Sequence, residues 1–266
     1  MWYSPPRDLW DLHVIGHHHH VPAIFKMRSR PSPTHLTISH LPISTFDINW
    51  ENLTSLKMTL TVFDGCIEAI QQAPLLEMCF INLGWIESLP PLPQIVVRHT
   101  RLRTLKLLHF LFELLCSFLD VLELPSLQAY HQQVSGLDIA ADNVTLLLNR
   151  SGVNLKQLTL DMHWPQGEDI KKILDAVPCL QHLHLEMCCI ANACVIHELF
   201  EMLSESSSPS IPVGDAPGFL PSLQSLTICA SGTSFWECIP RLFSSPHRKY
   251  LRLEVIKASI EIDKDT

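Results

Sequence analysis

The chain has 266 residues, of which 47% are hydrophobic and 17% are charged, and its formal net charge is −8. This composition excludes a disordered chain and allows a large buried core. The acidic balance argues against a nucleic-acid partner, because phosphate binding needs a dense face of Lys and Arg side chains. We therefore expect a folded protein that does not bind nucleic acid.

Residues 1–32 contain prolines and a run of four histidines, His17 to His20, but no repeating pattern, and we expect an irregular N-terminal lead-in. Four consecutive imidazoles rarely surround one metal ion, and no Cys or acidic partner lies at ligand spacing, so an exposed polar loop is favoured over a metal site. The segment lacks the basic start and apolar stretch of a signal peptide. Because the nine cysteines are also not typical of a disulfide framework, we expect a cytoplasmic or nuclear location.

From residue 33 to residue 256 one pattern recurs, with an apolar residue at positions 1, 4 and 6 of each copy. The clear copies begin at Leu53, Leu76, Leu102, Leu155, Leu180 and Leu223, and weaker copies are Leu36-x-Ile38, Leu127-x-x-Tyr130 and Leu251-x-Leu253. Their fourth positions (36, 56, 79, 105, 130, 158, 183, 226 and 251) are separated by 20, 23, 26, 25, 28, 25, 43 and 25 residues. Leucine-rich repeats have periods of about 20–29 residues, so the sequence predicts a domain of such repeats over 33–256.

The period has a simple physical origin. Apolar residues two apart face one side of a short strand, which buries that side only by stacking in parallel with neighbouring strands. Apolar residues at helical spacing in 65–72, 142–148, 168–176 and 194–203 supply the return path, and Pro74, Pro125, Pro178 and Pro221 are expected to end helices. We therefore predict an α/β leucine-rich-repeat solenoid, a curved horseshoe with parallel strands on the concave face and helices or irregular segments on the convex face.

Three segments depart from the regular pattern. The step of 43 residues contains 204–218, which is rich in Ser, Pro and Gly and is expected to be a flexible inserted loop. The three prolines within 88–98 predict an extended return path. The most apolar stretch, 105–124, contains charged residues, so it indicates a strand, a turn and a buried helix and no membrane partner. Residues 257–266 are expected to form a C-terminal tail.

The concave face is the candidate binding surface, because positions 5 and 7 of each copy point to solvent there. Phe and Arg side chains are enriched at protein-binding hot spots, so we expect an unidentified protein partner, although an ordinary solvated face is the alternative for each residue. The candidate residues are Lys57, Phe80, Asn82, Lys106, His131, Asp161, His184, Glu186 and Arg252.

A second group combines four cysteines, Cys179, Cys188, Cys189 and Cys194, with His182 and His184. The spacing does not match a zinc site, and Cys188 falls at position 9, where we expect a side chain inside the stack. A Cys–His catalytic pair is the alternative. The chain contains no G-x-S-x-G, H-E-x-x-H or phosphate-binding loop, so we expect no enzyme, no cofactor and no metal.

Several strings resemble the leucine-rich regions of the F-box proteins of mushroom-forming fungi. They are THLTISHLPI (34–43), LPSLQAY (124–130), LLLNRSGVNLKQLTL (146–160), DIKKILDAVPCLQHLHLEM (169–187) and LPSLQSLTI (220–228). The resemblance covers roughly 33–255 and implies the substrate-recognition part of a cullin-based ubiquitin ligase.

In that family an F-box precedes the repeats and binds the ligase adaptor. Residues 1–32 show no such three-helix module, so we do not expect the adaptor as a partner. We expect a monomer. A truncated fragment without independent function is the remaining alternative.

Overall fold

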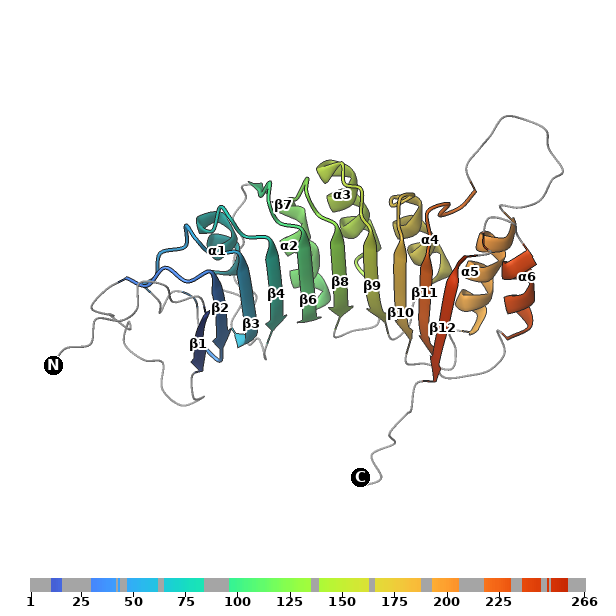
Figure 1. Cartoon of the computed structure of the whole chain (residues 1–266), viewed down its shortest axis with the longest axis horizontal. Coiled ribbons are helices and arrows are strands. Elements are labelled where there is room, and N and C mark those ends of the chain that lie inside the picture. Colours follow the sequence, from blue (N-terminus) through green and yellow to red (C-terminus); the bar gives the residue numbers. More distant parts are fainter. Residues whose placement is uncertain are drawn as a thin grey trace, which may run out of the picture. The chain divides into compact units, whose positions relative to one another are not determined.

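A computed structural model describes residues 11–15, 30–41, 43, 47–61, 65–83, 96–134, 139–162, 166–187, 193–205, 218–230, 236–244, 248 and 250–257. They belong to two compact units, Met1–Leu127 and Gln128–Thr266. In each unit parallel strands alternate with helices, and the helices run along one side of the strands (Figure 1). The α/β class predicted from the sequence is therefore confirmed, with five parallel strands described in each unit.

The first unit contains five parallel strands, two helices and a separate pair of short strands. The five strands lie in chain order: β1 (Asp11–Ile15), β2 (His35–Ser39), β3 (Ser55–Thr61), β4 (Met78–Leu83) and β6 (Thr104–Phe110). The helices are α1 (Cys66–Gln72) and α2 (Phe112–Asp120), and the short parallel pair is β5 (Val97–Arg98) and β7 (Leu122–Glu123). The strand, turn and helix predicted for 105–124 are present.

The second unit repeats this arrangement with more helix. Its strands are β8 (Ala129–Val134), β9 (Gln157–Met162), β10 (His182–Met187), β11 (Ser225–Ala230) and β12 (Arg252–Lys257), parallel and in chain order. Its helices are α3 (Ala141–Ser151), α4 (Gly167–Asp175), α5 (Ala193–Glu205), the short 3-10 helix η3 (Trp236–Cys238) and α6 (Ile239–Ser244). Among the described residues, no helix has the length and apolar character needed to cross a membrane.

The apolar positions of the predicted pattern form the core of each unit. Leu56 at position 4 of β3 pairs with Leu36 of β2 and Cys79 of β4, and all three side chains are buried. Leu183 of β10 is likewise buried between Leu158 and its β11 neighbour. Since strands in register place equivalent residues side by side, the position-4 residue of each copy extends a buried row.

The backbone links successive copies in a constant way. The carbonyl of Thr34 accepts hydrogen bonds from the N–H groups of Thr54 and Ser55, at 2.8 and 3.1 Å. The carbonyl of Gln181 accepts the N–H of Gln224 at 2.8 Å and that of the next residue at 3.0 Å. The step from Gln181 to Gln224 is the long one of 43 residues, so the additional residues leave the strand-to-strand geometry unchanged.

The prolines that restart the pattern lie in β-turns. In each case the leucine two residues after the proline donates its N–H to the carbonyl of the residue that precedes the proline, at 3.0–3.1 Å. Proline suits the second position of such a turn because its φ is already fixed near −65°. The prediction that these prolines end helices is wrong for Pro125, which follows β7, and for Pro221, whose preceding described residues are not helical.

The chain ends and insertions differ from expectation at several boundaries. Residues 1–32 were expected to be irregular, but Asp11–Ile15 forms β1, in parallel register with β2. Its side chains are at most half-buried, but Leu9-x-x-Leu12-x-Val14 matches the apolar pattern, which the sequence analysis missed. Helix α5 continues to Glu205, beyond the predicted start of the inserted loop. The His17–His20 run and residues 88–95, 206–217 and 258–266 lie outside the described residues.

Two polar side chains interrupt the apolar core of the second unit. Tyr130 and Gln132 occupy positions 4 and 6 of β8, are 2% and 1% exposed, and join through a 2.8 Å hydrogen bond from the Tyr130 hydroxyl to Gln132 Oε1. The Gln132 Nε2 group is buried and has no hydrogen-bond partner among the described residues. Leu160 occupies the equivalent place in β9.

Replacing both residues by apolar ones is expected to stabilise the second unit. The double variant Tyr130→Phe/Gln132→Leu removes an unsatisfied amide whose burial costs about 1–3 kcal/mol, and we expect a gain of about 1 kcal/mol in the free energy of unfolding. Urea denaturation measures it. The single change Tyr130→Phe, which leaves Gln132 with no phenol donor, is the control and should destabilise. A double variant less stable than the wild type would show that the pair stabilises the fold.

Candidate functional site

The strand face opposite the buried leucines carries the predicted binding residues of the first unit. We call this surface the open face; it consists of the side chains of residues 55, 57 and 59 of β3, 78, 80 and 82 of β4, and 104, 106 and 108 of β6. Lys57, Phe80 and Lys106 lie in register on these three neighbouring strands. The structure thus brings these three predicted residues together.

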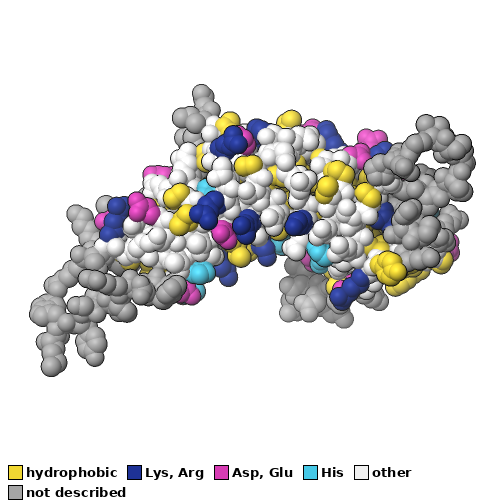
Figure 2. All heavy atoms as spheres, turned by 45° about the horizontal axis from the view of Figure 1, so that its top comes forward, with side chains coloured by type: hydrophobic (Ala, Val, Ile, Leu, Met, Phe, Trp, Pro, Cys, Tyr) yellow, Lys and Arg dark blue, Asp and Glu magenta, His cyan; other side chains and the backbone are white. Residues whose placement is uncertain are grey.

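The contacts within this row are those of a cation beside an aromatic ring. The Lys57 Nζ atom is 5.4 Å from the centroid of the Phe80 ring, within the range of a cation–π interaction. Both lysines are exposed, and within the part of the chain that the structure describes neither pairs with a carboxylate. Figure 2 shows Lys and Arg side chains interspersed with hydrophobic ones on the visible surface. The row therefore presents an aromatic ring between two available positive charges.

Two further side chains complete this surface. Met78, on the same strand as Phe80, is 47% exposed although it is apolar. The sequence analysis missed it because it considered positions 5 and 7 and not position 3. Asn82 is half-buried, and its Oδ1 atom is buried without a hydrogen-bond partner among the described residues. An unsatisfied buried carbonyl costs about 1–3 kcal/mol, so this oxygen is a local cost to the fold and is not accessible to an occupant of the open face.

In the second unit the predicted residues share a face, but one of them is buried. His131 and His184 both pair with Thr159, so they lie on either side of one position-5 residue. Asp161 was predicted to line the surface, yet it is only 8% exposed and accepts a hydrogen bond from Gln133 Nε2. Its neighbours in register are Gln133 and Glu186. The prediction of an exposed Asp161 is therefore wrong.

The predicted position of Arg252 is also wrong. Arg252 pairs with Ser225, whereas Glu254 pairs with Thr227 and thus occupies position 5. The N–H of Leu251 donates to a turn carbonyl, as the N–H of the position-1 leucine does in other copies. In those copies one residue separates this leucine from its strand, whereas Leu251 directly precedes β12. Arg252 remains exposed on the same side of β12, with its Nη2 atom 3.7 Å from a Glu254 carboxylate oxygen.

The second group of candidate residues is only partly assembled. His184 Nε2 lies 3.7 Å from the Sγ atom of Cys229 on the next strand, a contact that the sequence analysis did not identify. Cys179 and Cys194 are exposed, and Cys188 and Cys189 lie outside the described residues. In the described part of the chain no group of three His, Cys, Asp or Glu side chains is arranged to hold a metal ion. Burial raises the pKa of the Cys79 thiol to about 12, so this thiol stays protonated and unreactive.

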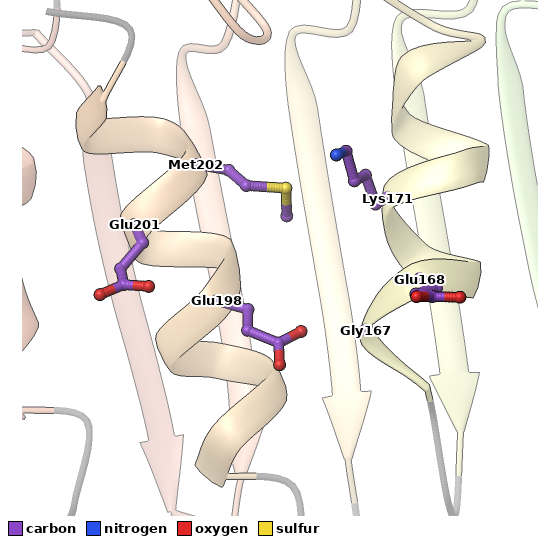
Figure 3. Close-up of a pocket in the computed structure, with 6 residues that line it drawn as sticks. All are labelled: Gly167, Glu168, Lys171, Glu198, Glu201 and Met202. Carbon is purple, nitrogen blue, oxygen red and sulfur yellow. The ribbon is translucent and has the colours of Figure 1, made fainter.

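A pocket of about 220 Å³ lies between α4 and α5 of the second unit. Its lining residues are Gly167, Glu168, Lys171, Glu198, Glu201 and Met202. Figure 3 shows Glu198 and Met202 pointing from α5 toward α4, and Lys171 pointing from α4 toward α5. The Glu198 carboxylate approaches Gly167 so closely that a side chain at this position would clash with it. No Cys or His lines the pocket, so it contains neither half of the Cys–His pair.

We compared the chain with protein-family models, curated proteins and solved structures, and none of the three comparisons finds a match. The function must therefore be argued from the surfaces of the protein itself.

Proposed function

We propose that this chain is a leucine-rich-repeat solenoid that binds another protein and catalyses no reaction. The links between successive strands support the repeat architecture, because six carbonyls each accept two N–H groups of the following copy: those of Thr34, Thr54, Glu77, Gln128, Lys156 and Gln181. In such stacks each copy contacts only its neighbours, and the strand face is left available for a partner. The observation that carries the proposal is the row of Lys57, Phe80 and Lys106 on the open face.

The chemistry of this row suits protein recognition. Aromatic rings contribute much of the binding energy at protein interfaces because they bury a large rigid surface. Phe80 is half-buried and held beside Lys57, so little conformational entropy is lost when a partner covers it. Exposed Met78 adds a flexible apolar side chain that adapts to different partner shapes.

An enzyme with a Cys–His pair is the alternative, and the contact between Cys229 and His184 is the observation in its favour. Nucleophilic catalysis needs a base that is itself oriented by a third group. No carboxylate of the described residues pairs with His184, and the pocket between α4 and α5 lies on other elements. Protein binding is therefore better supported.

A comparison of three baits tests the proposal. Extracts of cells that express the chain are passed over immobilised wild type, Phe80→Ala and Phe112→Ala, and the bound proteins are quantified. Phe112 lies in helix α2 of the same unit and is 36% exposed, so it provides a matched loss of an exposed ring. We expect at least one protein whose recovery falls about tenfold with Phe80→Ala and stays unchanged with Phe112→Ala. Equal recovery on all three baits would contradict binding through the open face.

The more specific role, resembling the substrate-recognition part of an F-box ubiquitin-ligase receptor, rests on the sequence resemblance. If it is correct, a partner captured through Phe80 gains ubiquitin when the chain is co-expressed with it. An unchanged ubiquitin level on that partner would remove this role and leave protein binding in place.

A further inference from the structure

The open face carries local positive charge in an acidic protein. The formal net charge is −8, yet Lys57 and Lys106 are both exposed and have no carboxylate partner among the described residues. No acidic side chain occupies the nine positions of the open face. Positive charge at a binding surface selects and steers a partner of opposite charge.

The spacing of the two lysines restricts the partner further. Lys57 and Lys106 are in register on β3 and β6, with β4 between them. Neighbouring strands are about 4.8 Å apart, so the two lysine backbones lie about 10 Å apart. An extended peptide in the polyproline II conformation has three residues per turn and advances about 3.1 Å per residue. A peptide of this kind that crosses the strands therefore places the side chains of residues i and i+3, about 9 Å apart, over the two lysines.

The side chain between the two lysines indicates which kind of residue the middle of the bound peptide must contain. Phe80 lies halfway along this path, and Met78 is exposed beside it on the same strand. An apolar residue of the peptide between the two acidic ones would cover the Phe80 ring. We propose that the open face of the first unit binds an extended acidic segment of a protein, with two carboxylates three residues apart and an apolar side chain between them. This inference rests on the proposed protein-binding function.

The same observations disfavour a nucleic acid on this face. A duplex or single strand presents many phosphates in succession, and its binding needs several cations along its path. The open face supplies two lysines and no arginine, and the remaining protein is acidic. A short peptide with two carboxylates matches the available charges.

Fluorescence anisotropy with synthetic peptides on the full-length chain tests the proposal. The probe is a labelled ten-residue peptide that contains Asp-Leu-Ser-Glu at its centre and is otherwise Ser and Gly. One control peptide has the same composition with the two acids adjacent, and the other contains Asn and Gln in their place. We expect saturable binding of the probe and affinity about tenfold lower for each control. Raising the ionic strength from about 0.05 to about 0.5 M should weaken the probe's binding.

Two variants that change the net charge by the same amount show where the peptide binds. Lys57→Glu/Lys106→Glu should weaken the probe's binding by about a hundredfold, because it places like charges opposite each other. Arg101→Glu/Lys156→Glu changes the net charge equally at exposed residues outside the open face and should bind as the wild type does. Thermal unfolding checks that both variants are folded. Equal loss in both variants, equal binding of all three peptides, or no binding would overturn the proposal.

Together with the bait comparison, these experiments distinguish an error in the proposed charge pattern from an absence of protein binding. If the bait comparison recovers a partner through Phe80 but the acidic probe does not bind, the proposed charge pattern is wrong and protein binding stands. If a single-stranded oligonucleotide displaces the probe with higher affinity than the acidic peptide, the face selects polyanions and the peptide proposal fails.

Discussion

Replacing Arg248 by alanine is expected to lower the free energy of unfolding by about 2–4 kcal/mol, because buried hydrogen bonds to a charged donor are lost. The Arg248 side chain is 3% exposed and belongs to the segment that connects α6 to β12. Its Nη1 atom donates to the carbonyl of Leu220 at 2.8 Å, and Nη2 donates to the carbonyl of Phe219. Leu220 has a φ of 47°, so the guanidinium holds a turn with an unfavourable backbone conformation.

The cost of burying this cation does not reverse the expected sign. Burial lowers the pKa of Arg248, which shows that the charged form is partly desolvated. Removing the side chain, however, takes a charged donor from the carbonyls of Leu220 and Phe219 and leaves a cavity. Urea denaturation of Arg248→Ala measures the loss, with Arg252→Ala as the control because Arg252 is exposed. Arg248→Lys should recover part of it, since an ammonium reaches only one carbonyl well. A loss no greater than that of the control would contradict this role.

Replacing His99 by alanine should destabilise the first unit by about 2–4 kcal/mol, because the buried N–H of Leu102 loses this acceptor, the carbonyl of Ala73 loses one of its two donors, and a cavity is left. The His99 ring is 5% exposed, and its Nδ1 atom accepts the N–H of Leu102 at 3.0 Å. Its Nε2–H group donates to the carbonyl of Ala73, the C-cap residue of α1, at 2.9 Å. In other copies a backbone carbonyl accepts the N–H of the position-1 leucine. Here the imidazole of His99 replaces that carbonyl as the acceptor.

The matched control for His99 is His13→Ala, because the His13 side chain is 61% exposed. Urea denaturation should show a loss for His99→Ala and almost none for His13→Ala. The variant His99→Phe retains the ring volume without either nitrogen, so it separates packing from hydrogen bonding. If His99→Phe is as stable as the wild type, the hydrogen bonds contribute nothing and our account of this residue is wrong.

The rows of buried apolar side chains and the order of the strands were predictable from the sequence, because both depend on a local pattern of residues. Leu56, Leu105 and Leu183 each sit two residues from another apolar residue, and this alternation alone assigns them to the buried side. Helices α1, α3, α4 and α5 followed from apolar spacing in the same way, whereas η3 and α6 were not predicted. The step to Arg252 was misjudged because one residue fewer separates Leu251 from its strand, so Leu251 was assigned to position 4, which Leu253 occupies.

The buried polar contacts were not predictable from a single sequence. His99 and Arg248 act on carbonyls 26 and 28 residues away, so their roles depend on how copies of different length stack. Asp161 was judged from its own strand position, but its burial comes from residues on the two neighbouring strands. The row of Lys57, Phe80 and Lys106 was predicted correctly, because equivalent positions of regular copies must align.

Photo-cross-linking from the open face tests the central claim most directly. A photoreactive phenylalanine analogue is introduced at Phe80 in one variant and at Phe112 in another, each of which keeps an aromatic ring at its site. After irradiation in cells that express the chain, the account predicts a discrete cross-linked protein from position 80 and none from position 112. Cross-linking of the same protein from position 112 alone, or from neither position, would contradict a binding surface on the strands.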